Sequence, residues 1–162
     1  MPAETTIRPE SPSHPQVRSL LADLDRYLAS LYPPEANHIL DEQALLDPAV
    51  SFFAAWQGGR IVGCGAARRM PGDADSGGRR YGEIKRMVVD PAARGHGIGV
   101  QLLRRLEAAL RDDGVELALL ETGRDQVAAV RLYERCGYLR RAAFGGYPDN
   151  GLSLFMAREL AP

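Results

Sequence analysis

The 162-residue chain carries 20 lysine and arginine residues against 21 aspartate and glutamate residues, a balance that argues against a general nucleic-acid-binding protein. Apolar residues make up 45% of the sequence. No apolar run, however, approaches the roughly 20 residues that a membrane-spanning helix needs. We therefore expect one globular domain over residues 1–162, cytoplasmic, with no nucleic-acid or membrane partner.

The first half of the chain predicts a strand, two helices and then three strands. Apolar residues from Val17 to Leu31 fall at helical spacing, and Pro33-Pro34 ends that helix. The Gly58-Gly59 pair is typical of a hairpin turn between two strands. The expected elements are a strand over 5–8, helices over 17–31 and 41–46, and strands over 51–57, 60–69 and 81–89.

The second half predicts a helix, a strand, a second helix and two closing strands. An apolar stripe over Leu102, Leu103, Leu106 and Leu110 indicates an amphipathic helix, and Gly114 follows its end. The expected elements are helices over 99–110 and 126–135 and strands over 115–122, 138–143 and 152–158. This order predicts an α/β (α+β) domain built on a mixed sheet.

The cysteine and histidine residues form no metal-binding pattern. Cys64 and Cys136 lie far apart, and His14, His38 and His96 are equally scattered, so no zinc motif can be written. We expect no metal cofactor and two reduced, buried cysteines. The chain has a single lysine among its basic residues, Lys85, which we interpret as compositional bias.

A glycine-rich turn directly precedes the helix over 99–110. Its residues are Arg94, Gly95, His96, Gly97, Ile98 and Gly99. Alternating glycines let successive N–H groups point into one concavity, and the helix adds its unpaired N-terminal donors and positive dipole end. Such a place suits a phosphate or pyrophosphate, and Arg94 can bind phosphate oxygens in bidentate fashion.

Two other phosphate-binding patterns do not fit this turn. A P-loop requires Gly-Lys followed by Ser or Thr, whereas Gly99 is followed by Val100 and Gln101. A dinucleotide-binding fingerprint needs a different glycine spacing and repeated βαβ halves. A turn without any ligand is the remaining alternative, but closely spaced glycines cost stability unless something approaches the backbone.

Three segments resemble the GNAT family of N-acetyltransferases. Arg94-x-x-Gly97-x-Gly99 matches the family signature Arg/Gln-x-x-Gly-x-Gly/Ala. The segment Glu83–Pro91 resembles the strand that precedes this signature. Gln126–Tyr138 resembles a second family motif, Asn-x-x-Ala-x-x-Leu-Tyr-x-x-x-Gly-Phe, with Gln126 in place of Asn. Two motifs in the right order are far more specific than a glycine turn alone.

The resemblance implies a fold and an acyl donor. The expected fold is a mixed, mostly antiparallel sheet of six to seven strands, splayed at the centre and flanked by about four helices. The expected donor is acetyl-CoA, whose pantetheine arm lies beside the strand that ends in Met87, Val88 and Val89. Its pyrophosphate is expected on the N–H groups of residues 94–99, and Gln126 and Tyr133 are expected to contact the cofactor as well.

The resemblance also implies catalytic roles. Glu83 matches the position of a glutamate base in some relatives, or is a solvated residue at a strand end; Glu121 is the rival base. Tyr133 matches a tyrosine that protonates the leaving thiolate, or is an aromatic core residue. A covalent acyl-cysteine intermediate at Cys136 is not expected, because no histidine accompanies it in the sequence.

The acceptor is expected near the 32–38 connection and the 144–150 turn. Tyr32, Phe144 and Tyr147 would form aromatic walls for a small amine, together with Glu83 and Glu121, or the aromatics merely cover the end of the sheet. The expected reaction is acetylation of a primary amine by direct attack in a ternary complex. Protein lysine or N-terminal acetylation, and a non-catalytic acetyl-CoA-binding regulatory module, are the alternatives. A homodimer is the expected assembly.

Overall fold

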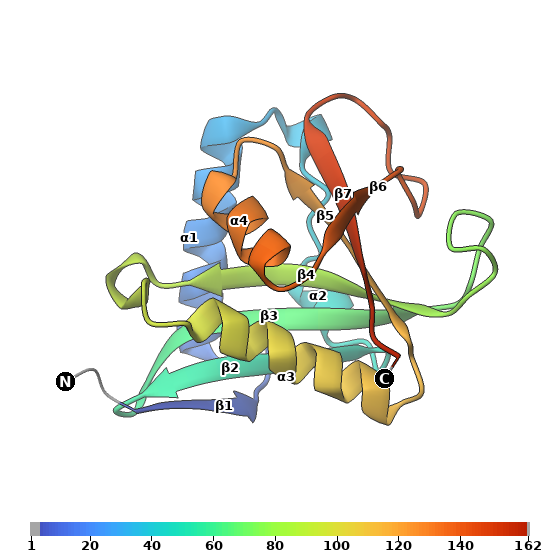
Figure 1. The fold of residues 1–162 in the computed structure, drawn as a ribbon. Coiled ribbons are helices and arrows are strands. Elements are labelled where there is room, and N and C mark those ends of the chain that lie inside the picture. Colours follow the sequence, from blue (N-terminus) through green and yellow to red (C-terminus); the bar gives the residue numbers. More distant parts are fainter. Residues whose placement is uncertain (1–3, 162) are drawn as a thin grey trace.

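A seven-stranded sheet runs through the molecule in the order β1-β2-β3-β4-β5-β7-β6 (Figure 1). The computed structural model describes residues 4–161. The strands are β1 (Thr5–Pro9), β2 (Val50–Gln57), β3 (Arg60–Met70), β4 (Tyr81–Val89), β5 (Leu117–Gly123), β6 (Leu139–Arg141) and β7 (Ser153–Glu159). Only β4 and β5 are parallel neighbours, and the other neighbouring pairs are antiparallel. The expectation of a mixed, mostly antiparallel sheet is confirmed.

Helices cover both faces of this sheet (Figure 1). They are α1 (Pro15–Leu31), α2 (Glu42–Leu45), α3 (Ile98–Asp112) and α4 (Val127–Arg135), with short 3-10 turns at Pro34–Ala36 and Pro91–Ala93. The helices α1 and α2 lie on one face, and α3 and α4 lie on the other. Four α-helices therefore flank the sheet, as expected from the family resemblance.

Two of the expected strands are shorter in the structure. The strand expected from Val115 begins at Leu117, because the Val115 N–H group closes the end of α3 by donating to the Leu110 carbonyl at 2.9 Å. Gly114, with a φ of 74°, provides the left-handed turn that this closure needs. The strand expected over 138–143 covers only 139–141, and the chain beyond it turns inward to bury Phe144.

The apolar stripe of α3 forms the centre of the larger core. Leu102, Leu103, Leu106 and Leu110 are fully buried, and each contributes about 1.5–3 kcal/mol by leaving water. Glycine in the sheet lets this helix approach closely, because a Cβ added at Gly82 would lie 2.3 Å from a Leu110 methyl carbon. The helix thereby holds the glycine turn at its N-terminus in a fixed position beside β4.

The sheet opens between β4 and β5. These strands pair over only three residues, Gly82 to Ile84 on β4, so the backbone of residues 85–89 has no partner on its β5 side. A β-bulge helps to bend β4 at this point: Gly65 of β3 faces both Arg86 and Met87, and Arg86 has a φ of 58°. The opening confirms the expected central splay and creates the space in which the candidate site lies.

A buried carboxylate on α3 joins three elements on the α4 side of the molecule. Glu107 is fully buried and accepts hydrogen bonds from the Tyr138 hydroxyl at 2.8 Å, from Arg158 at 2.6 Å and from Arg104 at 2.9 Å. Arg104 also donates to the Cys136 carbonyl at the end of α4. These contacts tie α3 to β7 and fix the end of the helix that carries Tyr133.

Replacing Tyr138 with Phe should therefore lower the free energy of unfolding by about 1.5–3 kcal/mol, because a buried carboxylate loses a hydrogen bond. Urea denaturation followed by circular dichroism measures this change. Tyr133→Phe is the matched control, because its hydroxyl makes no hydrogen bond with the described residues. Equal losses of stability in the two variants would contradict the role given to the Tyr138–Glu107 contact.

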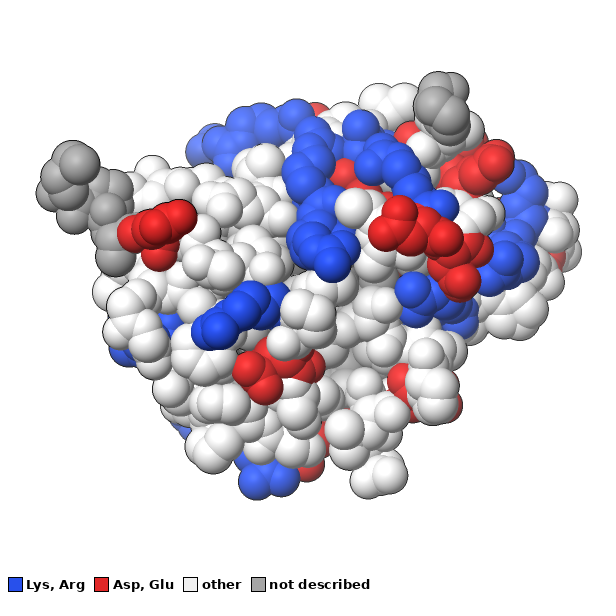
Figure 2. Space-filling view, turned by 90° about the horizontal axis from the view of Figure 1, so that it is seen from below, with Lys and Arg blue, Asp and Glu red and all other residues white. Residues whose placement is uncertain are grey.

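Acidic and basic side chains are interspersed on the surface. On the face shown in Figure 2 they lie beside one another, with uncharged side chains between the groups. Several form exposed ion pairs, for example Arg18–Glu42 and Arg79–Glu159. No helix in the described part of the chain is long and apolar enough to cross a membrane.

Candidate active site

A large cavity of about 520 Å³ lies between the end of β4, the glycine turn and α4. Its walls include most of the residues expected to bind the cofactor: Met87, Val88, Val89, Arg94, Gly95, Gly97, Ile98, Gly99, Gln126 and Tyr133. Leu24 and Tyr27 of α1 close one side, and Leu132 and Arg135 of α4 close the other. His96 is exposed and does not line the cavity.

The glycine turn forms part of the wall of this cavity. Gly95 and Gly97 have φ values of 87° and 78°, and open space lies where a Cβ would project from either residue. Gly97 is the N-cap of α3, and the N–H groups of the first helical turn have no partner inside the helix. The exposed Arg94 side chain donates to the Val89 carbonyl at 3.2 Å, which ties the turn to the end of β4. This geometry suits a pyrophosphate.

Gly97→Ala should weaken acetyl-CoA binding about tenfold, because a residue with a Cβ gains about 1–2 kcal/mol by leaving the left-handed conformation, and that change would move the N–H groups of a turn that lines the cavity. Isothermal titration calorimetry measures the Kd. Gly77→Ala is the matched control, because Gly77 has a φ of 66° and equal open space but lies outside the cavity. An unchanged Kd for Gly97→Ala would argue against the turn as the pyrophosphate site.

A second, smaller cavity of about 110 Å³ lies in the opening between β4 and β5. It shares five lining residues with the larger cavity: Leu24, Met87, Gln126, Ala129 and Tyr133. The two cavities therefore meet at these residues. Lys85 lines the small cavity from β4, Glu121 lines it from β5, and His38 covers it from the connection after α1.

Tyr133 stands where the two cavities meet. Its ring is buried and packs edge-to-face on Tyr138, with 5.8 Å between the ring centroids. Burial raises the pKa of the Tyr133 hydroxyl above its usual value, which keeps it protonated at neutral pH. The hydroxyl makes no hydrogen bond with residues 4–161. A protonated donor without a protein partner is therefore available at the junction.

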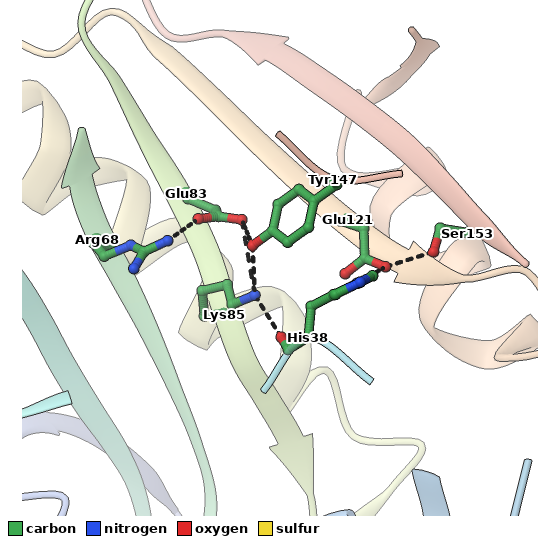
Figure 3. A network of polar contacts seen from close by, with 7 residues as sticks. All are labelled: His38, Arg68, Glu83, Lys85, Glu121, Tyr147 and Ser153. Atoms are coloured by element: carbon green, nitrogen blue, oxygen red, sulfur yellow. Dashed lines mark hydrogen bonds and ion pairs between the residues drawn. The ribbon is translucent and has the colours of Figure 1, made fainter. Parts of the chain in front are cut away.

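The two candidate bases lie in different surroundings (Figure 3). Glu121 lines the small cavity, accepts a hydrogen bond from the Ser153 hydroxyl at 2.6 Å and lies 3.4 Å from the His38 ring nitrogen Nδ1. Glu83 is 1% exposed and lines neither cavity. Its carboxylate accepts from Arg68 at 2.8 Å and from the Tyr147 hydroxyl at 2.6 Å. The structure therefore brings Glu121, and not Glu83, to the cavity wall.

Lys85 connects these groups and was not expected as a site residue. Its ammonium donates to the His38 carbonyl at 2.9 Å and to the Tyr147 hydroxyl at 3.0 Å, and it lies 3.8 Å from Glu83 (Figure 3). Burial lowers its pKa, while the nearby Glu83 and Glu121 act in the opposite direction. The only lysine of the chain is thus a buried group that lines the small cavity, a position that the interpretation of its rarity as compositional bias did not anticipate.

The three aromatic residues expected around the acceptor have different positions. Tyr32 is buried, lines the small cavity and accepts a hydrogen bond from the Asp125 N–H group at 3.0 Å. Tyr147 does not line the small cavity, but its hydroxyl contacts Lys85, which does, and Glu83. Phe144 lines neither cavity: it is 1% exposed and packs in a separate core cluster with Tyr147 and Phe155. For Phe144, the alternative of covering the end of the sheet fits the structure.

Comparison with known proteins identifies the family. The model of the Acetyltransferase (GNAT) family matches residues 16–138. The chain belongs to the GNAT family. It is accordingly an N-acetyltransferase, an acyltransferase that uses an acyl-CoA donor.

Individual relatives agree with this assignment. An IAA acetyltransferase from Azospirillum brasilense is 46% identical over 155 residues, which cover 96% of this chain and 97% of the relative. A candidate acyl-CoA N-acyltransferase of known structure from Klebsiella pneumoniae is 34% identical, with a TM-score of 0.80 and coverage of 97% and 98% of the two chains. The PaiA N-acetyltransferase of Thermoplasma acidophilum, solved with coenzyme A, shares the fold at 16% identity, with a TM-score of 0.74 and coverage of 96% and 99%.

The GNAT site shows no metal-binding arrangement. Within residues 4–161, no group of three or more His, Cys, Asp or Glu side chains is placed to hold a metal ion. Both cysteines are buried and unpaired, and burial raises the pKa of the Cys64 thiol to about 12. Neither cysteine lines a cavity of the site, so the thiols offer no nucleophile to a bound thioester.

Proposed function

We propose that this GNAT protein transfers the acetyl group of acetyl-CoA to the primary amine of a small molecule, by direct attack in a ternary complex. The observation that supports this proposal most strongly is the meeting of the two cavities at Tyr133. One cavity has the lining expected for coenzyme A, and the other has charged groups suited to an amine. Acetyl-CoA bound in the large cavity would place its thioester at this junction, within reach of an amine bound in the small cavity.

The large cavity would hold acetyl-CoA. The backbone of Met87 to Val89, unpaired on its β5 side, would bind the pantetheine arm as an added strand. The N–H groups of residues 94–99 would bind the pyrophosphate, with Arg94 at the mouth. Gln126 lines both cavities and would contact the arm near its thioester end.

In the proposed reaction, Glu121 removes a proton from the acceptor ammonium. The neutral amine then attacks the thioester carbonyl carbon, the C–N bond forms and the C–S bond breaks, and the second proton that the nitrogen loses restores the Tyr133 hydroxyl once that hydroxyl has protonated the sulfur. Tyr133 donates a hydrogen bond or its proton to the leaving sulfur, and a phenol with a raised pKa is still protonated when the sulfur acquires charge. Glu83 acts through Lys85 and Tyr147 as a positioning residue and does not contact the acceptor.

The size and cover of the small cavity favour a small acceptor. Its volume of about 110 Å³ is well below the roughly 300–1,000 Å³ of sites for drug-sized ligands. Ala36 to Ile39 line it on one side and Leu152 and Ser153 on another, which leaves less room than an extended peptide would need. The similarity to an IAA acetyltransferase along nearly the whole chain agrees with a small-molecule substrate.

The test is thiol release from acetyl-CoA across a panel of small amines, amino acids and lysine-containing peptides, with product mass confirmed by mass spectrometry. We expect turnover with small amines and little with peptides. Turnover confined to peptides or protein N-termini would favour protein acetylation. Tight acetyl-CoA binding without turnover of any acceptor would favour a regulatory binding module. Either result would overturn the proposal.

A further inference from the structure

The β4 wall of the small cavity carries a buried ammonium with an unused donor. The Lys85 side chain is 6% exposed. Two of its three N–H groups are used by the His38 carbonyl and the Tyr147 hydroxyl. The carboxylate of Glu83, at 3.8 Å, is beyond hydrogen-bond distance, and residues 4–161 offer the third N–H group no other acceptor. One donor is therefore available to a bound molecule.

Lys85 makes no direct hydrogen bond to a carboxylate. Glu83 supplies one negative charge to two cations, Arg68 at 2.8 Å and Lys85 at 3.8 Å. The nearer partner, Arg68, forms the direct hydrogen bond, and its side chain is 30% exposed and reaches water. Lys85 has no such access. A buried cation is stable only when it is paired, so this wall favours an anionic partner from the cavity.

The opposite wall has the opposite charge. The Glu121 side chain is 11% exposed, and among the described residues no lysine or arginine nitrogen lies within 4.0 Å of its carboxylate. Its partners are the Ser153 hydroxyl and the His38 ring. His38 contacts both walls, because its carbonyl accepts from Lys85 while its ring lies against Glu121 (Figure 3). The ammonium of Lys85, which attracts an anion, and the carboxylate of Glu121, which attracts a cation, thus line one small cavity, and His38 contacts both.

We propose that the acceptor is a zwitterion of the amino acid class, whose carboxylate binds Lys85 while its ammonium binds Glu121. This inference rests on the proposed acetylation of a small amine and narrows its substrate class. A carboxylate fits better than a phosphate, because the two cations Arg68 and Lys85 stand against the two carboxylates Glu83 and Glu121, which suits an acceptor without net charge, and because a single free N–H group is on offer. Binding the carboxylate at β4 orients the amine toward β5, where the proposed base stands.

A comparison of matched acceptors tests the inference on the unmodified enzyme. The probes are the twenty standard amino acids, their primary carboxamides and the amines left by removal of their carboxyl groups, assayed by thiol release at saturating acetyl-CoA. We expect kcat/KM for the preferred amino acid to exceed that of its carboxamide and its amine at least tenfold. Equal or faster acetylation of the carboxamide or amine would overturn the inference and leave the proposed function intact. No thiol release with any amine would instead defeat both.

The same comparison of acceptors with the Lys85→Met variant is the second test of the inference. If Lys85 binds the carboxylate, the preference for amino acid over carboxamide should fall from at least tenfold to about one. Arg18→Met, which removes an exposed cation distant from the cavities, is the control and should keep the preference. Lys85→Gln serves if Lys85→Met does not fold, because glutamine retains a donor for the His38 carbonyl. A preference that survives in a folded Lys85 variant would overturn the assignment.

Discussion

Glu121→Gln should lower kcat about 100-fold or more while leaving the Kd for acetyl-CoA within about twofold. A general base typically raises the reaction rate by about 10²–10⁴-fold. The base is needed because an alkyl ammonium with a pKa of about 10 is almost wholly protonated at neutral pH. Glutamine keeps the shape of the side chain and can still accept from the Ser153 hydroxyl, but it cannot take a proton. Steady-state kinetics with the best amine of the panel, together with calorimetry for acetyl-CoA, measures both quantities.

Glu83→Gln is the informative comparison, because the family resemblance points to Glu83 as a base. Its carboxylate lies behind Lys85 and Tyr147, so its replacement should disturb KM and the position of Lys85 more than the proton transfer itself. The fall of kcat at low pH that protonation of the base causes should therefore persist in Glu83→Gln and disappear in Glu121→Gln. The reverse pattern would return the role of base to Glu83.

The donor side of this site could be predicted because its pattern is local in the sequence. The turn at 94–99, the strand before it and the helix after it follow one another, and glycine spacing directly reflects backbone geometry. The lining of the large cavity agrees with that interpretation at most positions. The exception, His96, is an exposed residue between two glycines, and spacing alone does not show which way its side chain points.

The acceptor side could be predicted only in part, because it is assembled from distant segments: Glu121 and Tyr147 were expected there, but Lys85 was not. Lys85, His38, Tyr147 and Glu121 belong to β4, to the connection after α1, to the loop before β7 and to β5. The family resemblance predicts the splay between β4 and β5, but it does not show which side chains of these distant segments come into contact there. The one available signal was the solitary lysine within a predicted strand, since a lysine is rarely buried without a partner.

The position of Phe144 could not be predicted for a similar reason. Aromatic residues near the mouth of a sheet are equally compatible with a ligand wall and with a core. The short β6 strand decides between them, because its pairing with β7 ends at Arg141 and the chain then folds back over Tyr81 and Phe155. Pairing length is set by long-range contacts, and the sequence of residues 138–143 gives no sign of where it stops.

Tyr133→Phe should lower kcat about 100-fold with little change in acetyl-CoA affinity. The variant removes a single oxygen that has no hydrogen bond with the described residues, so neither stability nor ring packing on Tyr138 should suffer. What it removes is the proposed donor to the sulfur, whose hydrogen bond would matter only as the C–S bond breaks and charge develops there. Pre-steady-state kinetics separates this chemical step from product release.

Two outcomes distinguish a proton donor from a packing residue. A donor role predicts that kcat and kcat/KM fall together in Tyr133→Phe, because the lost interaction exists only in the transition state. A packing role predicts a rise in the Kd for acetyl-CoA with kcat nearly intact, because the ring lines the cavity that would hold the pantetheine arm. Tyr138→Phe is the matched control: it disturbs the support behind Tyr133 through Glu107 but leaves the hydroxyl at the junction. If Tyr138→Phe slowed turnover as much as Tyr133→Phe, the effect would belong to the position of α4, and the hydroxyl of Tyr133 would not be the proton donor.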